Sequence, residues 1–220
     1  FLLISISGNP FFSGDLVQIF VFLYSLTVFS FRKKRINKNE IHFILIFTLV
    51  LIFQSLKFNF FPITTLLGVY IRVLTAYLVV KILDFKFIIS YIKVLYFLSI
   101  TSIVFYIINN LSINILTPIS INTSGIESLY PRYSVFGLFT YIPGYSIRNS
   151  GPFWEPGAFS GYLVLALFFN YFNPIKYKKN KQLVLLTTIV TTMSTTGYIC
   201  ILIFYLLVYQ KKIKNLFIKF

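Results

Sequence analysis

The nonapeptide "RNSGPFWEP", residues 148–156, gathers reactive side chains in an otherwise apolar chain. It contains Arg148, Glu155 and the only Trp of the sequence, Trp154, although all 220 residues include just five Asp and Glu. A guanidinium group matches phosphate oxygens with a two-pronged set of donors, and a carboxylate can take a proton from a hydroxyl group. The segment therefore predicts an anion-handling site or, as a structural alternative, an Arg148–Glu155 ion pair with Trp154 as an interfacial aromatic.

Pro156 suits the first position of a helix, and the residues after it form an apolar run. The start of such a helix presents unpaired N–H groups and the positive end of the helix dipole, which together favour an anion. A lipid diphosphate fits this place, because its chain stays in the bilayer while its headgroup is handled at the surface. Glu155 would compete with the anion, so we expect it to neutralise or orient Arg148, or to act as a general base.

Two further arginines are candidates for substrate binding. Arg72 lies near the middle of the apolar run 63–83, where a charge costs about 2.5–3.5 kcal/mol in a membrane. We expect it to face a bundle interior, a cavity or a bound anion; contacts to helix-end carbonyls and water are the structural alternative. Arg132 lies in "YPRYS", where the neighbouring Tyr130 and Tyr133 have the composition of a membrane-interface belt.

Other chemistries have little support in the sequence. The remaining carboxylates are scattered along the chain, so no clustered metal site is visible and no metal is expected. Gly-rich phosphate loops, HExxH helices and GxSxG elbows do not occur, and no cofactor is expected. The single cysteine, Cys200, excludes an intrachain disulfide.

The composition is that of a membrane protein. Hydrophobic residues make up 57% of the chain and aromatic residues 20%, and the mean hydropathy is +0.83. Twenty Lys and Arg against five acidic residues give a net charge of +15, which in a soluble protein would suggest nucleic acid. Here the basic residues cluster between apolar runs, as in cytoplasmic loops, so we expect no nucleic-acid partner.

We expect an all-α polytopic membrane protein, a bundle of six or seven transmembrane helices with one large extracytoplasmic loop at 110–156. A spanning helix needs about 20 mainly apolar residues. The aromatic stretch "LYPRYSVFGLFTYIPGYS" within the loop is weakly amphipathic, so we expect it to lie in the interface. The basic segments "RKKR" and "NPIKYKKNK" mark the cytoplasmic side. The expected spans lie at about 16–31, 41–56, 63–83, 87–109, 157–172, 182–195 and 197–209.

The last apolar stretch, 182–209, poses a topological problem. As a single helix it would place "QKKIKN" on the wrong side of the membrane, so we expect a break at "STTG", residues 194–197. Two halves of about 14 residues are too short to cross, and irregular backbone within the membrane needs a protein-lined or wet cavity. We therefore expect a cavity beneath the outer face. The structural alternative is that the hydroxyls of Ser194–Thr196 bond back to helix carbonyls.

Residues 147–167, "IRNSGPFWEPGAFSGYLVLAL", resemble the signature segment of bacterial O-antigen and exopolysaccharide polymerases of the Wzy type and of the related O-antigen ligases. The later segment "MSTTGYICILIFY", 193–205, is similar to the part of that family that follows a short basic loop. "LGVYIRVLTAYLVVKI", 67–82, resembles it more loosely. The order and spacing of the first two segments make the resemblance more specific than either alone.

This resemblance implies a multi-pass protein of the bacterial cytoplasmic (inner) membrane that acts at its outer face without metal or nucleotide sugar. A glycan would pass from undecaprenyl diphosphate to another lipid-linked repeat unit, for O-antigen, capsule or exopolysaccharide synthesis. Arg148 and Glu155 would be catalytic, and Arg72, Arg132 and Trp154 would bind the diphosphate or glycan. Beside membrane lipid, a chain-length regulator and a flippase are candidate partners.

The chain also departs from the family. It has fewer spans than the polymerases, so we expect it to be a piece of a longer protein, and an Arg-to-Gly spacing typical of some members is not met. An O-antigen ligase-type transferase is one alternative. A polysaccharide or lipid-headgroup transporter, holding Arg72 and Arg148 in a cavity without chemistry, is another.

Overall fold

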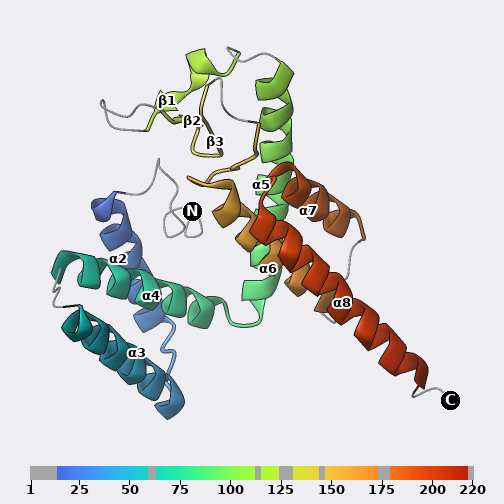
Figure 1. Ribbon diagram of the computed structural model, residues 1–220. Coiled ribbons are helices and arrows are strands. Elements are labelled where there is room, and N and C mark those ends of the chain that lie inside the picture. The colour runs from blue at the N-terminus through green and yellow to red at the C-terminus, as the bar shows by residue number, and fades with distance from the viewer. Residues whose placement is uncertain are drawn as a thin grey trace. The chain divides into compact units, whose positions relative to one another are not determined.

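The computed structural model describes residues 14–58, 63–111, 115–123, 131–143, 147–172 and 179–217, which are mostly helical (Figure 1). The chain divides into an N-terminal unit, Ser13–Phe87, and a C-terminal unit that includes Ile88–Phe220. The helices are α2 (Asp15–Phe31), α3 (Lys38–Lys57), α4 (Ile63–Leu83), α5 (Lys86–Leu111), α6 (Pro156–Phe172), α7 (Lys179–Thr191) and α8 (Thr195–Phe217).

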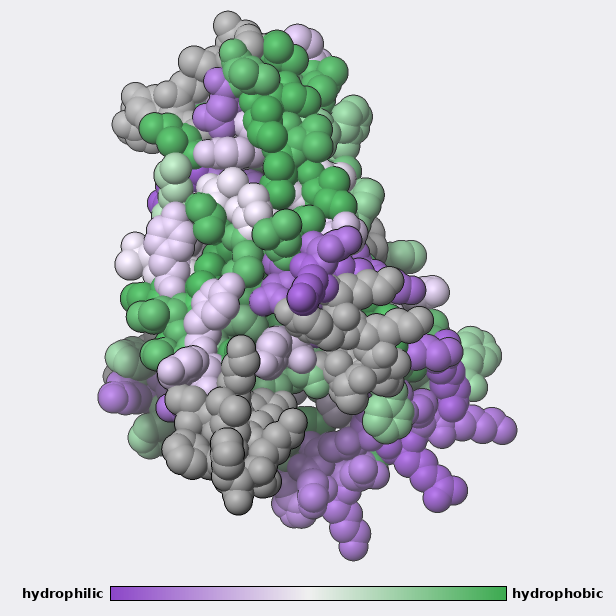
Figure 2. Space-filling model, turned by 90° about the vertical axis from the view of Figure 1, so that its right-hand side faces the viewer, coloured by the Kyte–Doolittle hydropathy of each residue, from purple (hydrophilic) through white to green (hydrophobic). Residues whose placement is uncertain are grey.

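Three helices in the described part of the chain, α3, α4 and α5, are long and apolar enough to cross a membrane. The helices α2, α6 and the Thr195–Gln210 part of α8 are apolar but shorter. Only 6% of the most apolar stretch of α3 and 11% of that of α4 are buried inside the protein. Apolar side chains also cover much of the surface seen in Figure 2. Such exposed apolar helices require an apolar surrounding, as a bilayer provides.

In the N-terminal unit, α2 packs against α4, and polar contacts join the start of α3 to the end of α4. Glu40 completes a capping box with Asn37 at the start of α3, where the Asn37 N–H donates to its carboxylate at 2.7 Å. The same carboxylate pairs with Lys81 of α4 at 2.6 Å and accepts from the Tyr77 hydroxyl at 2.9 Å. One acidic residue thus fixes two helix ends together.

In the C-terminal unit, α6 packs against α7 and α8 around fully buried side chains. Gly197 at the start of α8 permits the close approach, because a Cβ there would lie 2.9 Å from the Cβ of Ser160 and 3.2 Å from the Cγ2 of Ile189. The buried side chains include Phe159, Leu163, Leu167, Leu185, Ile189 and Phe204.

The segment between α5 and α6 forms a three-stranded antiparallel sheet in the order β1 (Ile121–Asn122), β2 (Tyr133–Val135) and β3 (Phe139–Tyr141). The sequence did not predict this sheet, and the expected place of the aromatic stretch in the interface stays a prediction. Val135, Phe139 and Tyr141 are buried with Leu116 and pack against aromatic residues of α5. The strands are too short for their alternation to stand out in a sequence rich in Phe and Tyr.

The break between α7 and α8 lies at residues 192–194, just before the position expected. Met193 has a φ of 47°, a left-handed conformation that ends α7. Ser194 then caps α8, because its Oγ accepts from the Gly197 N–H at 3.3 Å. The alternative of back-bonding to a helix carbonyl is therefore not what the structure shows for Ser194. Thr195–Gly197 form the first turn of α8, and α8 continues to Phe217 rather than ending near residue 209.

Candidate functional site

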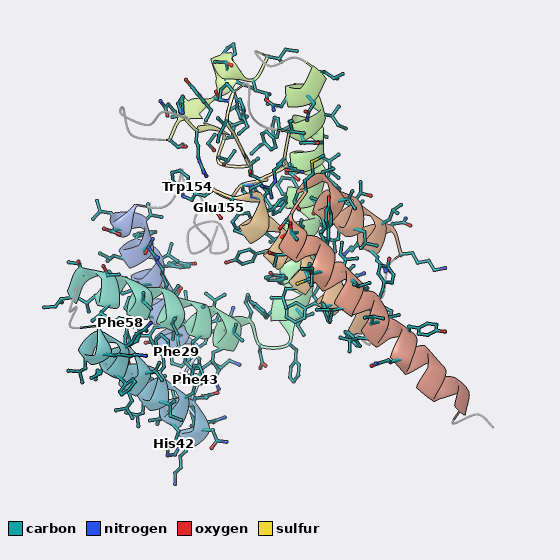
Figure 3. All side chains as sticks on the ribbon, in the orientation of Figure 1. Phe29, His42, Phe43, Phe58, Trp154 and Glu155 are labelled. Atoms are coloured by element: carbon teal, nitrogen blue, oxygen red, sulfur yellow. The ribbon has the colours of Figure 1, made fainter. Side chains whose placement is uncertain are left out.

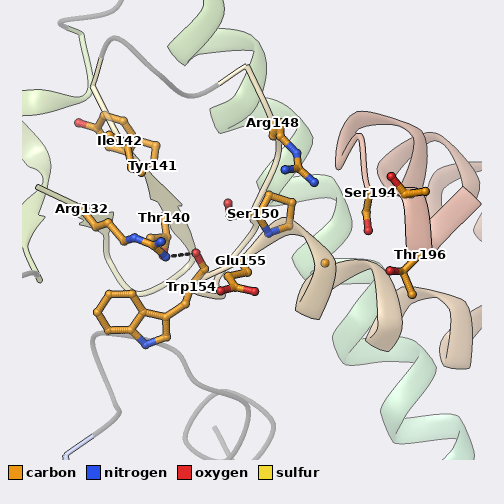
Figure 4. Close-up of a pocket in the computed structure, with 13 residues that line it drawn as sticks. Arg132, Thr140, Tyr141, Ile142, Arg148, Ser150, Trp154, Glu155, Ser194 and Thr196 are labelled. Atoms are coloured by element: carbon orange, nitrogen blue, oxygen red, sulfur yellow. Dashed lines mark hydrogen bonds between the residues drawn. The ribbon is translucent and has the colours of Figure 1, made fainter. Parts of the chain in front are cut away.

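A cavity of about 470 Å³ in the C-terminal unit lies where the loop before α6 meets the start of α8 (Figure 4). Four of the five candidate residues line it. Glu155 lies between a group containing Arg132 and Trp154 on one side and a group containing Arg148 and Ser194 on the other. The lining residues are Arg132, Thr140, Tyr141, Ile142, Arg148, Ser150, Trp154, Glu155, Pro156, Gly157, Ser194, Thr195 and Thr196.

The loop that carries the candidates is held by close packing. Gly151 has a φ of 53°, and a Cβ on it would lie 2.5 Å from the ring of Phe159, so only glycine fits there. Its carbonyl accepts from the Thr140 N–H of β3 at 2.7 Å. Phe153 is buried and stacks on Tyr162 of α6, with ring centroids 4.9 Å apart. Backbone conformation and aromatic packing thus set the path of the loop.

Arg148 is exposed, and its Nε donates to the carbonyl of Thr192 at the end of α7 over 3.2 Å. Within the part of the chain that the structure describes, its two terminal nitrogens have no hydrogen-bond partner and it forms no salt bridge. The alternative of an Arg148–Glu155 ion pair is therefore not what the structure contains. One nitrogen orients the side chain, and the other two remain available to a ligand.

Arg132 and Trp154 form a pair at the other side of the cavity. The guanidinium carbon of Arg132 lies 5.2 Å from the centroid of the indole ring, a cation–π arrangement. Its Nη1 also donates to the Trp154 carbonyl. Arg132 is half-buried in this contact. It positions the indole and the backbone immediately before Glu155, a role that the sequence did not indicate.

Glu155 is exposed on the segment that leads into α6 (Figure 3). Its backbone carbonyl accepts the N–H of Phe159 at 3.2 Å, and Pro156 takes the first helical position. Among the described residues, no side chain pairs with its carboxylate. Within the described part of the chain, the carboxylate therefore lies at the cavity with no side chain paired to it.

Two helix starts contribute to the cavity wall, Pro156–Gly157 of α6 and Ser194–Thr196 at α8. Both present N–H groups and the positive end of a dipole. With Arg132 and Arg148, they give the cavity four sources of positive potential against one carboxylate. The arrangement favours a ligand that carries more than one negative charge.

Two polar residues of the site were missed in the sequence. Asn149 is completely buried beside Arg148. Thr140 lines the cavity, and its buried Oγ1 has no hydrogen-bond partner among the described residues. Neither could be found from a pattern, since single Asn and Thr residues are common in loops. Tyr130 lies outside the described residues.

Arg72 is not among the residues that line this cavity, because it belongs to α4 in the N-terminal unit. Its Nε donates to the side-chain oxygen of Gln18 on α2 at 2.9 Å, and the Arg72 side chain is exposed. The polar contact for this mid-helix charge thus comes from a neighbouring amide. Its expected role toward an anionic substrate stays a prediction.

No three His, Cys, Asp or Glu residues of the described chain come together as a group that could hold a metal. His42 lies near the start of α3 (Figure 3) and does not line the cavity. Comparison of the chain with protein-family models, curated proteins and solved structures finds no match.

Proposed function

We propose that this protein is a membrane glycosyltransferase that polymerises lipid-linked oligosaccharide repeat units at the outer face of the bacterial cytoplasmic membrane. The proposal rests on one observation above all. Arg148 is fixed through its Nε while its terminal nitrogens are unpaired among the described residues, in a cavity that two helix starts enter.

This side of the cavity suits a diphosphate. Unpaired guanidinium nitrogens and backbone N–H groups donate to phosphate oxygens, and Ser194, Thr195 and Thr196 add hydroxyl groups to the same wall. Ligand sites in proteins have volumes of roughly 300–1,000 Å³, a range that includes this cavity. The apolar helices beside it suit a donor whose lipid chain stays in the bilayer, as undecaprenyl diphosphate does.

The proposed reaction uses the carboxylate of Glu155 as general base. It takes the proton from a sugar hydroxyl of the acceptor repeat unit, and that oxygen attacks the anomeric carbon of the donor glycan. The bond between this carbon and the diphosphate oxygen breaks, and the electron pair leaves with the lipid diphosphate. Arg148 and the two helix dipoles stabilise the developing negative charge. Protein groups therefore supply each role in this scheme.

Arg132 and Trp154 form the proposed glycan side of the cavity. An indole offers a flat apolar face to a sugar ring, and Arg132 holds this indole through stacking and a hydrogen bond. Arg72 is proposed to contact the anionic substrate as well. This part of the proposal is supported only by the resemblance of residues 67–82 to the polymerases.

Replacement of Arg148 by Ala in the chromosomal gene tests the proposal. We expect long polysaccharide chains to disappear from the surface while single repeat units are still exported. Lys38→Ala, which removes an exposed charge at the start of α3, is the matched control and should leave the chain-length ladder unchanged. An unchanged ladder in Arg148→Ala would refute the diphosphate role, whereas loss of exported single units would identify a transporter.

A further inference from the structure

We propose that Asn149 is a positioning residue that holds Arg148 in the cavity by clamping the loop between α5 and α7. This inference rests on the proposed function, because Arg148 is the group through which Asn149 would act. The clamp itself is a property of the described contacts and can be tested without an activity assay.

Asn149 is completely buried and uses every polar group of its side chain. Its Nδ2 donates to the Thr191 Oγ1 at 3.0 Å and to the Ser102 Oγ at 3.3 Å. Its Oδ1 accepts from the Gly151 N–H at 2.9 Å, and its own N–H donates to the Thr191 carbonyl at 3.0 Å. A buried amide with all these bonds made is costly to replace.

The orientation of this amide follows from its two hydroxyl partners. The Thr191 hydroxyl donates to the carbonyl of Thr188 at 2.7 Å, and the Ser102 hydroxyl donates to that of Ser99 at 3.0 Å. Each hydroxyl has given its proton to its own helix, so each can only accept from Asn149. The donor end of the amide therefore faces α5 and α7, and its oxygen is left for Gly151. Aspartate, which lacks these donors, cannot substitute.

Arg148 and Asn149 together bind two carbonyls at the C-terminal end of α7, those of its last residue, Thr191, and of the following residue, Thr192. The Asn149 N–H takes the carbonyl of Thr191, and the Arg148 Nε takes that of Thr192. These carbonyls have no partners within the helix, because they lie at its end. Without Asn149, a single hydrogen bond from the exposed Arg148 side chain would hold this part of the loop. The buried Asn149 fixes the backbone next to Arg148 against the end of α7. This also fixes it relative to the start of α8, which forms part of the cavity wall.

Thr191 offers the sharpest test, since it can be changed without touching the loop. Thr191→Val removes the hydroxyl acceptor at nearly constant shape, and Thr191→Ser restores it. The readout is binding of farnesyl diphosphate to the purified protein in detergent, in the parent and in an Arg148→Ala background. We expect Thr191→Val to weaken binding about tenfold in the parent and Thr191→Ser to bind as the parent does. In the Arg148→Ala background, Thr191→Val should have no further effect.

The outcomes separate the two proposals. Equal weakening by Thr191→Val in both backgrounds would mean a merely structural contact and would overturn the positioning role, as would no weakening in the parent. If Arg148→Ala itself binds farnesyl diphosphate like the parent, the proposed function fails. Hydrogen exchange then tests whether Asn149 clamps the loop. Asn149→Ala should speed the exchange of the Gly151 amide, and the exchange of α3 peptides should stay unchanged. Unchanged exchange at Gly151 would overturn it.

Discussion

Arg72 and Arg148 are held in the same way in two different regions of the molecule. Each donates its Nε to one oxygen, of the Gln18 side chain in the N-terminal unit and of the Thr192 backbone in the C-terminal unit. Arg72 bonds to a side-chain amide, whereas Arg148 shares a cavity with a carboxylate, two helix starts and a second arginine. The two arginines therefore differ in their surroundings and not in how they are held. Only Arg148 lies beside other groups that can bind an anion.

The two regions also differ in how they position their arginine. Ordinary helix geometry places Arg72, which lies within α4. Arg148 lies in a loop whose path depends on a left-handed glycine, a buried Asn149 and a buried Phe153. We therefore expect the loop to be far more sensitive to single substitutions than α4.

The largest effect should come from Gly151→Ala. The new Cβ would lie within 2.7 Å of three atoms of the Phe159 ring in a left-handed backbone conformation, which costs roughly 1–3 kcal/mol for overpacking and about 1–2 kcal/mol for the conformation. Thermal unfolding in detergent should show a lower melting temperature and lost diphosphate binding.

Gly68→Ala is the matched control for this substitution. Gly68 lies within α4, and a Cβ there would meet nothing within 4 Å. Alanine is favoured over glycine inside a helix by about 0.5–1 kcal/mol, so the melting temperature should stay or rise slightly. Equal destabilisation by the two alanines would contradict the contrast between loop and helix.

Glu155→Gln should have the next largest effect. If Glu155 is the proposed general base, its loss should lower the proposed polymerisation at least roughly 100-fold, with long chains lost from the surface ladder. Farnesyl diphosphate should bind the variant as tightly as the parent or more tightly, because a negative charge has left the cavity. Asp15→Asn, at the exposed start of α2, is the control. Near-normal chain growth in Glu155→Gln would remove Glu155 from catalysis.

Arg132→Met should have a smaller effect that is directly visible. Trp154 is the only Trp of the chain, so the Trp fluorescence comes from this one indole, on which Arg132 stacks. Loss of the cation–π contact, worth about 0.5–1 kcal/mol at exposed sites, should lower the fluorescence anisotropy and shift the emission toward the red. Arg35→Met, at an exposed position before α3, should leave the spectrum unchanged. An unaltered spectrum in Arg132→Met would show that Arg132 does not hold the indole.

The helices were the predictable part of this fold. The expected run 63–83 coincides with α4, and 157–172 differs from α6 by one residue. Long apolar runs and the basic clusters between them are local features of the sequence, so they indicate where helices lie without knowledge of tertiary contacts. Three of the helices meet the length and composition needed for spanning, and the remaining expected spans stay predictions.

The candidate site was only partly predictable. The residue types and the helix start pointed to residues 148–156, and four candidates do line one cavity. The contacts that shape it join residues far apart in the sequence, such as Asn149 with Ser102, 47 positions away, and Arg148 with Thr192, 44 positions away. A periodic pattern of apolar residues does not indicate contacts between residues so far apart in the sequence. The small sheet was missed because its strands have at most three residues.

The most direct test of the central claim compares the two arginines in one titration. Farnesyl diphosphate is titrated into the purified protein in detergent, in the parent, Arg148→Ala and Arg72→Ala. Hydrogen bonds to charged groups are worth about 1.5–3 kcal/mol, so Arg148→Ala should weaken binding roughly tenfold to 100-fold, and Arg72→Ala should weaken it far less. Equal affinity of Arg148→Ala and the parent would contradict the account.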